Sequence, residues 1–409
     1  MSDHTNRVER PTVEPRPRLS VLRVVLAFAT IGALVAGGVI GYQRWVSRAE
    51  SGSAQTWFAG YVDVTATPTF DFQSPATRAG RDVVLSFIVS APNGPCTPTW
   101  GSAITLDEAS VSLDLDRKVA RLEQQGGAIA VSFGGQVNLD LAATCTDVDK
   151  LAAAYANVID RYNVSTIDLD VEGANLNDRA AGQRRAEAIK KLQSSRGTSE
   201  KSLAIWLTLP VSPNGLTADG QATVGEMLRT GVDLAGVNAM TMDYGGSRAN
   251  GQSMLAATTG ALDAVEPELK ILYHRAGSEL SSAAVWSKIG ATPMIGQNDV
   301  LDEVFGLDAA KGLNDFALSH RMGRVSMWSL NRDITCGPKY VDVKRVSDAC
   351  SGVSQGGRRF ADLLSAGIAG RLSASAHGVS SSSAKALDPH VTGSGHNLVS
   401  SNLRADASG

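Results

Sequence analysis

Three carboxylates alternate with aliphatic residues in one short apolar stretch of the chain. They are Asp168, Asp170 and Glu172, within the segment STIDLDVEG at residues 165–173. Side chains two residues apart on a β-strand point to the same face, so the three acids would share one face of a strand. Crowded carboxylates raise one another's pKa, and a carboxyl group with a raised pKa suits general acid catalysis near neutral pH. We therefore predict a catalytic cluster in which Glu172 is the acid, Asp170 assists it and Asp168 lies deepest.

The acidic spacing also resembles the start of a calcium loop, with Gly173 at its sixth position. A calcium loop needs a bidentate glutamate at its twelfth position, where this chain has Arg179, and it does not place aliphatic residues in a strand. The histidines show no metal spacing and no CxxC pair is present. We expect no metal and no cofactor, and a divalent-metal site of another kind stays the alternative.

Strand-like segments alternate with longer helical patterns over about 310 residues. The eight segments are 58–64, 83–89, 128–133, 164–171, 203–209, 234–242, 293–296 and 325–330. Helical patterns such as 148–162 and 178–193 stand between them. This alternation predicts an α/β fold, a (β/α)8 TIM barrel whose active site would form where Glu172 ends its strand. An open doubly wound sheet is the alternative, but no GxGxxG turn follows the first strand.

The N-terminal region predicts a membrane anchor. Its apolar run of about 19 residues at ~1.5 Å each would cross roughly 28 Å of hydrocarbon, and the preceding Arg-rich tail places that side in the cytoplasm. We expect a single-pass cell-membrane protein with its barrel outside, and secretion after signal cleavage is the alternative. The predicted segments are a cytoplasmic tail at 1–23, the anchor at 24–42, a linker at 43–55, the barrel at 56–370 and a Ser/Ala/Gly-rich disordered tail at 371–409.

The four cysteines agree with export, because an even number in an oxidising compartment predicts two disulfides. Three pairings are possible. Cys336 and Cys350 would close a short local loop, which would leave Cys96 and Cys145 to join two loops, and free buried thiols stay an alternative. The formal net charge of −3 gives no reason to expect a nucleic-acid partner, and we expect a monomer.

The acidic segment resembles the signature of the family 18 glycoside hydrolases, the chitinase family. The family pattern DGxDxDxE falls on residues 165–172, with DxDxE intact and Ser165-Thr166 in place of Asp-Gly. The family's SxGG motif matches Ser132-Phe133-Gly134-Gly135. Its QxMxYD motif lies over 238–243, where Met242 replaces the tyrosine and Tyr244 follows Asp243.

Three further segments, MTMDYG (240–245), MIGQND (294–299) and MWSLNRD (327–333), resemble one bacterial branch of the family. Trp328 falls where the family keeps its barrel-floor tryptophan. The resemblance covers roughly residues 57–364. The motifs are only moderately specific one by one, but their order along the chain makes them strong together.

The resemblance implies a retaining, substrate-assisted chitinase. Glu172 would protonate the glycosidic oxygen of a β-1,4-linked N-acetylglucosamine polymer, and the acetamido oxygen of the substrate would attack the anomeric carbon. Asp170, supported by Asp168, would stabilise the resulting oxazolinium ion. The substrate-binding residues that it implies are Asp243, Tyr244, Trp328, Met240, Ser132, Gly134 and Gly135. Judged by pattern alone, Met240 also fits core packing and the two glycines fit a tight turn.

Two other functions stay open: an endo-N-acetylglucosaminidase acting on another glycan, and a non-catalytic carbohydrate-binding protein. The intact Glu172 favours an enzyme, because binding proteins of this family typically lose the acid. The aromatic content of only 5% argues against processive attack on crystalline chitin. We therefore expect an N-acetylglucosamine-containing polysaccharide as the partner and glycoside hydrolysis as the reaction.

Overall fold

The computed structural model describes residues 55–196, 202–338, 340 and 346–372. The predicted cytoplasmic tail and anchor, and most of the predicted C-terminal tail, therefore lie outside the described residues. Within the described ranges, no helix combines the length and the apolar character that a membrane span requires.

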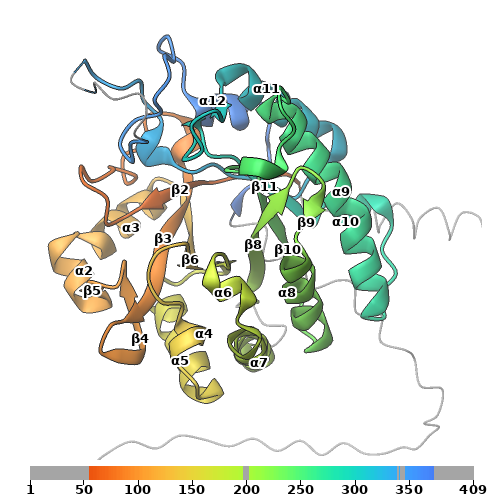
Figure 1. Ribbon diagram of the computed structural model, residues 1–409. Coiled ribbons are helices and arrows are strands. Elements are labelled where there is room, and N and C mark those ends of the chain that lie inside the picture. Colours follow the sequence, from red (N-terminus) through yellow and green to blue (C-terminus); the bar gives the residue numbers. More distant parts are fainter. Residues whose placement is uncertain (1–54, 197–201, 339, 341–345, 373–409) are drawn as a thin grey trace, which may run out of the picture.

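In the described part of the chain, eight parallel strands close into a barrel surrounded by helices (Figure 1). The barrel strands are β1 (Trp57–Phe58) continuing into β2 (Gly60–Asp63), β3 (Asp82–Ala91), β6 (Ala128–Gly134), β7 (Thr166–Asp170), β8 (Ala204–Ser212), β10 (Leu234–Met240), β11 (Ile289–Thr292) and β14 (Arg324–Val325). The ring closes because β1 pairs with β14 and β2 pairs with β3, both in parallel. The (β/α)8 prediction is confirmed.

The helices lie around the barrel (Figure 1). They are α2 (Leu106–Ser112), α3 (Leu115–Gln124), α4 (Leu141–Thr144), α5 (Val148–Arg161), α6 (Ala174–Asn177), α7 (Arg179–Arg196), α8 (Ala218–Arg229), α9 (Met254–Arg275), α10 (Ser282–Trp286), α11 (Leu307–His320) and α12 (Phe360–Leu364), with 3-10 turns η1 (Arg78–Gly80), η2 (Gly245–Ser247) and η3 (Leu330–Arg332). The helices predicted at 148–162 and 178–193 are confirmed as α5 and α7. Helix α5 begins where the Asp147 carboxylate accepts hydrogen bonds from two free backbone N–H groups, and it buries Leu151, Tyr155 and Val158.

Two predicted strands are misplaced. The seventh strand is Ile289–Thr292, just before the predicted 293–296, and it contains Gly290, which is a weak strand former. A Cβ on Gly290 would lie 2.9 Å from Asn238 Oδ1 and 3.1 Å from Arg324 Cβ, so only glycine fits beside these interior side chains. The eighth strand is Arg324–Val325, one residue ahead of the predicted 325–330. Its pairing continues through the predicted segment, since Ser326 N donates to the Ala291 carbonyl at 2.8 Å and Trp328 forms a parallel bridge with Met294, and the turn η3 begins at Leu330.

The structure contains further short strands in addition to the barrel strands, and the sequence pattern does not predict them. They are β4 (Gly94–Trp100), β5 (Ile104–Thr105), β9 (Gly215–Leu216), β12 (Gly296–Gln297) and β13 (Val304–Phe305). Strand β4 runs antiparallel to the long strand β3, and this pair extends the second barrel strand into a hairpin.

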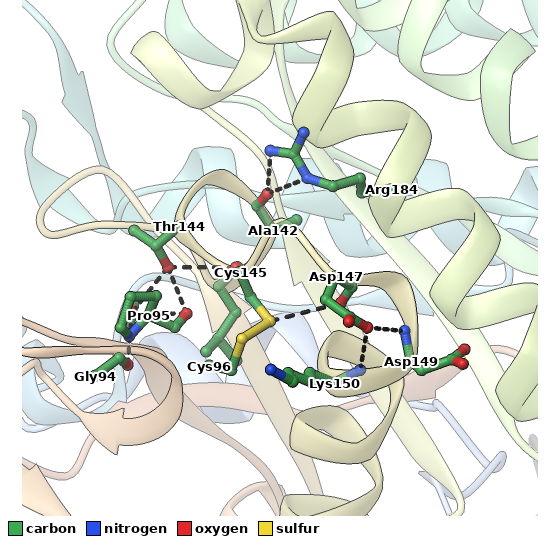
Figure 2. The surroundings of a disulfide bond; sticks show 12 residues. Gly94, Pro95, Cys96, Ala142, Thr144, Cys145, Asp147, Asp149, Lys150 and Arg184 are labelled. Carbon is green, nitrogen blue, oxygen red and sulfur yellow. Dashed lines mark hydrogen bonds between the residues drawn. A yellow bond between two sulfur atoms is a disulfide. The ribbon is translucent and has the colours of Figure 1, made fainter.

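All four cysteines lie in the described ranges and form the two predicted disulfides. Of the three possible pairings, the structure has Cys96–Cys145 and Cys336–Cys350. Figure 2 shows the first, which ties the β4 hairpin to the segment between α4 and α5. Thr144 supports the same junction, because its hydroxyl donates to the Pro95 carbonyl at 2.7 Å. The disulfide thus holds an irregular hairpin against the regular barrel.

The barrel extends two residues beyond the predicted boundary at 370. Arg371 forms an ion pair with Asp82, the first residue of β3, and Leu372 is 1% exposed. Leu372 packs in a cluster at the lower end of the barrel interior that includes Trp57 and Ala59. The sequence composition assigns Arg371 and Leu372 to the tail, because the Ser-rich segment that follows them dominates the local composition.

Candidate active site

The three acids follow one another up strand β7 and beyond its end. Asp168 and Asp170 point into the barrel and are 0% and 4% exposed, while Glu172 lies two residues past Asp170 and is half-buried. The alternating residues Leu169 and Val171 belong to the hydrophobic core between the strands and the helices. The alternation of the sequence thus divides β7 into an acidic inner face and an aliphatic outer face.

Asp168 accepts hydrogen bonds from side chains on four other strands. Tyr61 and Ser132 donate to Oδ2, each at 2.8 Å, and Thr208 donates to Oδ1 at 2.7 Å. The guanidinium of Arg324 also donates to Oδ1, and the two side chains form an ion pair in which both are 1% exposed. These hydrogen bonds and the ion pair therefore hold Asp168 in place at the inner end of the row of three acids.

The Arg324 guanidinium is packed among aromatic rings inside the lower half of the barrel. Its central carbon lies 5.2 Å from the ring centroid of Trp57, 5.4 Å from that of Tyr61 and 5.6 Å from that of Trp206. Such cation–π contacts stabilise a buried cation that water cannot reach.

Sequence reasoning missed these partners of Asp168. Tyr61, Thr208 and Asn238 are polar residues inside otherwise apolar strand segments, and that pattern is the signal that could have found them. Asn238 continues the network, because its side-chain amide donates to Thr208 Oγ1 at 3.0 Å and to Thr292 Oγ1 at 2.7 Å. Arg324 stands one residue before the segment predicted as the eighth strand, so the strand pattern does not include it.

Asp170 is buried with one oxygen unsatisfied. Its Oδ1 has no hydrogen-bond partner among the described residues. Burial, then the negative charges of Glu172 and Asp168, raise the pKa of Asp170 well above its usual value. Asp170 therefore binds a proton more readily than an exposed aspartate does.

Glu172 combines partial exposure with a shifted pKa. Burial and the nearby charge of Asp243 raise the pKa of Glu172 to about 7. A carboxyl group with this pKa is half protonated at neutral pH, so it can give a proton to a leaving group and later take one from water.

Asp243 comes just after β10, in a loop that other segments hold in place. Val300 N donates to its Oδ1 at 3.2 Å, and its own N–H donates to Asn298 Oδ1 at 3.3 Å. The buried Glu303 accepts from the backbone N–H groups of Tyr244 at 2.9 Å and Gly245 at 2.8 Å. Burial raises the pKa of Asp243. The loop thus presents a second carboxylate toward Glu172.

The structure does not bring the Tyr244 side chain to the acids. Its ring is 6% exposed and belongs to the hydrophobic core, near Thr258 of α9. Tyr244 follows Asp243 directly, and the chain turns there with a positive φ of 47° at Asp243. The two neighbouring side chains therefore point in different directions, and contact of Tyr244 with substrate stays a prediction.

Trp328 lies partly buried above the aromatic floor of the barrel. It stacks on Phe87 with ring centroids 5.4 Å apart and an interplanar angle of 23°, and it meets Tyr61 edge-on at 6.0 Å. Its position is compatible with contact to a sugar ring. Met240, the last residue of β10, is half-buried, so both of its interpretations stay open.

Ser132, Gly134 and Gly135 support the acids. Ser132 is fully buried on Asp168, and Gly135 N donates to the Asp170 carbonyl at 3.1 Å. Gly134 has a φ of 106°, and a Cβ there would collide with that same carbonyl oxygen. These residues therefore position Asp168 and Asp170, and their contact with substrate stays a prediction. In the described ranges, no group of three His, Cys, Asp or Glu side chains could hold a metal ion.

Two curated proteins are similar to this chain in sequence. The probable bifunctional chitinase/lysozyme of Escherichia coli is 36% identical over 288 residues, which are 68% of this chain and 31% of that protein. Endochitinase 11 of Metarhizium anisopliae is 35% identical over 285 residues, which are 68% of this chain and 52% of that protein. The chain thus spans about a third and about half of these relatives. No family model matches it.

Solved structures of a chitinase from Pyrococcus furiosus share the fold. Its catalytic domain is 27% identical, with a TM-score of 0.62 over 80% of this chain and 96% of that one. Catalytic-site mutants of its active domain 2, complexed with chito-oligosaccharides, are 26% identical, with a TM-score of 0.62 over 80% of this chain and 95% of that one. The likeness extends over nearly the whole of those domains.

Proposed function

Because the chain belongs to the chitinase-like glycoside hydrolases of family 18, we propose that it hydrolyses β-1,4-linked N-acetylglucosamine polymers with retention of configuration. The observation that carries this proposal is the row of acids on β7, in which the buried Asp168 and Asp170 lead to the half-buried Glu172. The pKa of Glu172, raised to about 7 by burial and by Asp243, supports it. The P. furiosus domain crystallised with chito-oligosaccharides supports the same substrate class.

In the first step, Glu172 donates its proton to the glycosidic oxygen, and the bond between that oxygen and the anomeric carbon breaks. The acetamido oxygen of the same sugar attacks the anomeric carbon from the opposite face and forms an oxazolinium ion. Asp170 lies beside Glu172 and faces this positive charge from below. The electrostatic stabilisation comes from groups already held in place by the strand, so little reorganisation is needed.

In the second step, Glu172 acts as the base. It removes a proton from water, whose oxygen attacks the anomeric carbon and opens the oxazolinium ring. Two inversions at the same carbon give net retention. Asp243, whose charge acts on Glu172, orients the acetamido group, and Trp328 stacks under the sugar ring.

A change of Glu172 to Gln tests the assignment. We expect the Glu172→Gln chain to lose at least about 1,000-fold in kcat on a fluorogenic N-acetylchitooligosaccharide, since Gln cannot supply the proton. Binding of the unlabelled oligosaccharide should persist. Tyr244→Phe is the matched control, because that hydroxyl is buried in the core, and its kcat should stay within about twofold of wild type.

Undiminished turnover by Glu172→Gln would reject this residue as the acid. If the wild-type chain binds the oligosaccharide and never cleaves it, the chain is a carbohydrate-binding protein. The name of the E. coli relative includes lysozyme, which favours cell-wall glycan as the second candidate substrate. Cleavage of peptidoglycan strands in preference to chitooligosaccharides would select it.

We also propose that the predicted segment 24–42 anchors the barrel outside the cytoplasm. The two disulfides support an oxidising compartment. The first and last described residues lie together, since Gly370 N donates to the Thr56 carbonyl at 3.0 Å, at the end of the barrel opposite Glu172. An anchored barrel would therefore present Glu172 on the side away from the membrane. Protease added to intact cells should degrade the barrel, and protection of the barrel would refute this placement.

A further inference from the structure

The position of Asp243 depends on the β11 loop, which we define as residues 294–303. Val300 N donates to Asp243 Oδ1 at 3.2 Å, and Asn298 Oδ1 accepts from Asp243 N at 3.3 Å. Asn298 is itself buried, and its amide group donates to the Met294 carbonyl at 2.9 Å within the same loop. A shift of the β11 loop would therefore shift the Asp243 side chain with it.

Arg332 reaches this loop from the last residue of η3. Its Nη2 donates to the Ile295 carbonyl at 3.1 Å and to the Gln297 carbonyl at 2.5 Å. Gln297 directly precedes Asn298 in the chain. One guanidinium nitrogen thus binds the backbone of the loop at the point where the contacts to Asp243 begin.

The turn that carries Arg332 is fixed on both sides. Before it, the Asn331 side chain accepts from Asp63 N and donates to the Asp63 carbonyl, each at 3.0 Å, at the end of β2. After it, the Asp333 carboxylate accepts from Phe360 N at 2.8 Å, at the start of α12. Arg332 therefore connects a rigid part of the barrel to the β11 loop.

Stability alone does not account for an arginine at this position. Arg332 is 1% exposed, and its Nε and Nη1 have no hydrogen-bond partner in the described part of the chain. Burial lowers the pKa of Arg332, which shows that its charged form is disfavoured there. An apolar side chain of similar volume would avoid this penalty. The same burial keeps a substrate from touching Arg332, so any effect on the reaction must pass through its protein partners.

We propose that Arg332 is a positioning residue, which holds the β11 loop so that Asn298 and Val300 fix the Asp243 carboxylate for the acetamido group of the substrate. This inference rests on the proposed function. The acetamido oxygen must lie in line with the anomeric carbon when it attacks, and a misplacement of about 1 Å can lower the rate about 100-fold. The contacts of Arg332 would prevent such a misplacement.

Three variants of the full-length chain test this role by their kcat on a fluorogenic N-acetylchitooligosaccharide. Arg332→Met removes both donors to the loop, and we expect it to lower kcat at least about tenfold. Arg332→Lys keeps a cation that can donate to at least one of the two carbonyls, and its kcat should stay within about threefold of wild type. Arg229→Met is the matched control on the exposed side of α8, and it should leave kcat unchanged.

A double-mutant cycle separates this role from a general structural one. Asp243→Ala removes the group that Arg332 is proposed to position. If Arg332 acts through Asp243, adding Arg332→Met to Asp243→Ala should lower kcat by less than about threefold further. An equal loss in both backgrounds would overturn the proposal, and so would an undiminished kcat in Arg332→Met alone. If Arg332→Met does not fold, Arg332→Gln goes through the same cycle, because its shorter side chain cannot reach both carbonyls.

A wild-type chain without turnover would instead remove the proposed function. In that event amide hydrogen exchange decides, because it reports the loop without any reaction. We expect the Val300 amide, which donates to Asp243, to exchange at least about tenfold faster in Arg332→Met than in wild type. The amides of β6 serve as the internal control and should keep their rates. Unchanged exchange at Val300 would refute the positioning role of Arg332.

Discussion

Glu172 owes its raised pKa to burial first and to Asp243 second, and this order has a consequence for stability. Burial in the folded protein disfavours the charged form of the Glu172 carboxyl group, whether or not another charge lies nearby. The same effect that prepares Glu172 to give up a proton therefore costs folding free energy once the group ionises. Catalytic readiness and stability oppose each other at this residue.

The pH dependence of unfolding should reveal that cost. The folded pKa of Glu172 is about 7 against an ordinary 4.5, so the folded state binds the extra proton between these values. The stabilisation is complete below pH 4.5 and is lost as the pH rises through 7. Glu172→Gln should therefore be more stable than wild type at pH 8, by up to about 3 kcal/mol, and equal to it near pH 4.

Thermal melts of both chains at pH 4 and pH 8 measure this difference. Asp263→Asn is the matched control, because Asp263 is exposed on α9 and its replacement should leave the pH dependence unchanged. A Glu172→Gln chain that is less stable than wild type at pH 8 would contradict the burial argument.

At this scale the sequence predicts the acids well and their partners poorly. Asp168, Asp170 and Glu172 follow from alternation alone, since strand periodicity places them on one face. Arg324 does not follow, because its partner is 156 positions away and only closure of the barrel brings the two together. The burial of Tyr244 does not follow either, because it sits one residue past Asp243, where the strand has ended and the backbone turns.

At the scale of elements, most barrel strands could be predicted from the sequence, and the seventh strand, which contains Gly290, could not. Segments 83–89 and 128–133 lie inside β3 and β6. The seventh strand begins before the predicted segment and contains Gly290. The Arg324 and Asn238 side chains fill the barrel interior beside this glycine and leave little room for a larger residue. A local sequence pattern carries no information about the space inside the barrel.

The β4 hairpin is another element that the local sequence pattern does not predict. Its sequence, GPCTPTW, contains two prolines, which argue against a strand. Prolines are tolerated at a sheet edge, and the Cys96–Cys145 disulfide together with Thr144 holds this edge on the barrel. Trp100 completes the attachment, since its indole N–H donates to the Tyr162 hydroxyl at 2.9 Å. Long-range cross-links thus stabilise a strand that local propensity disfavours.

For the molecule as a whole, the two ends of the barrel serve different purposes. Glu172 and Asp243 lie where the strands end, and this is where barrel folds place their chemistry. The opposite end is closed by apolar residues and by the returning C-terminal segment, in which Gly370 forms a bridge with Trp57. This closure makes the last two described residues part of the fold.

Removal of those two residues should therefore destabilise the barrel. Arg371 donates to both Asp82 oxygens, at 2.8 and 2.6 Å, and Leu372 N donates to the same carboxylate at 3.0 Å. A chain that stops after Gly370 leaves the Asp82 carboxylate, in a residue 4% exposed, without these donors and exposes the apolar surface that Leu372 covers. Loss of the partner of a buried charge and of a buried leucine would cost about 4 kcal/mol, allowing for the partial exposure of Arg371.

We expect the chain that stops after Gly370 to melt on the order of 10 °C below one that stops after Leu372. The second chain is the matched control, because it differs only by the two residues and keeps all the contacts of Asp82. Melting temperatures within about 2 °C of each other would mean that the barrel closes without this segment. A large difference instead places the C-terminal boundary of the domain at Leu372, because Arg371 then completes the charge pairing and Leu372 the apolar packing at that end.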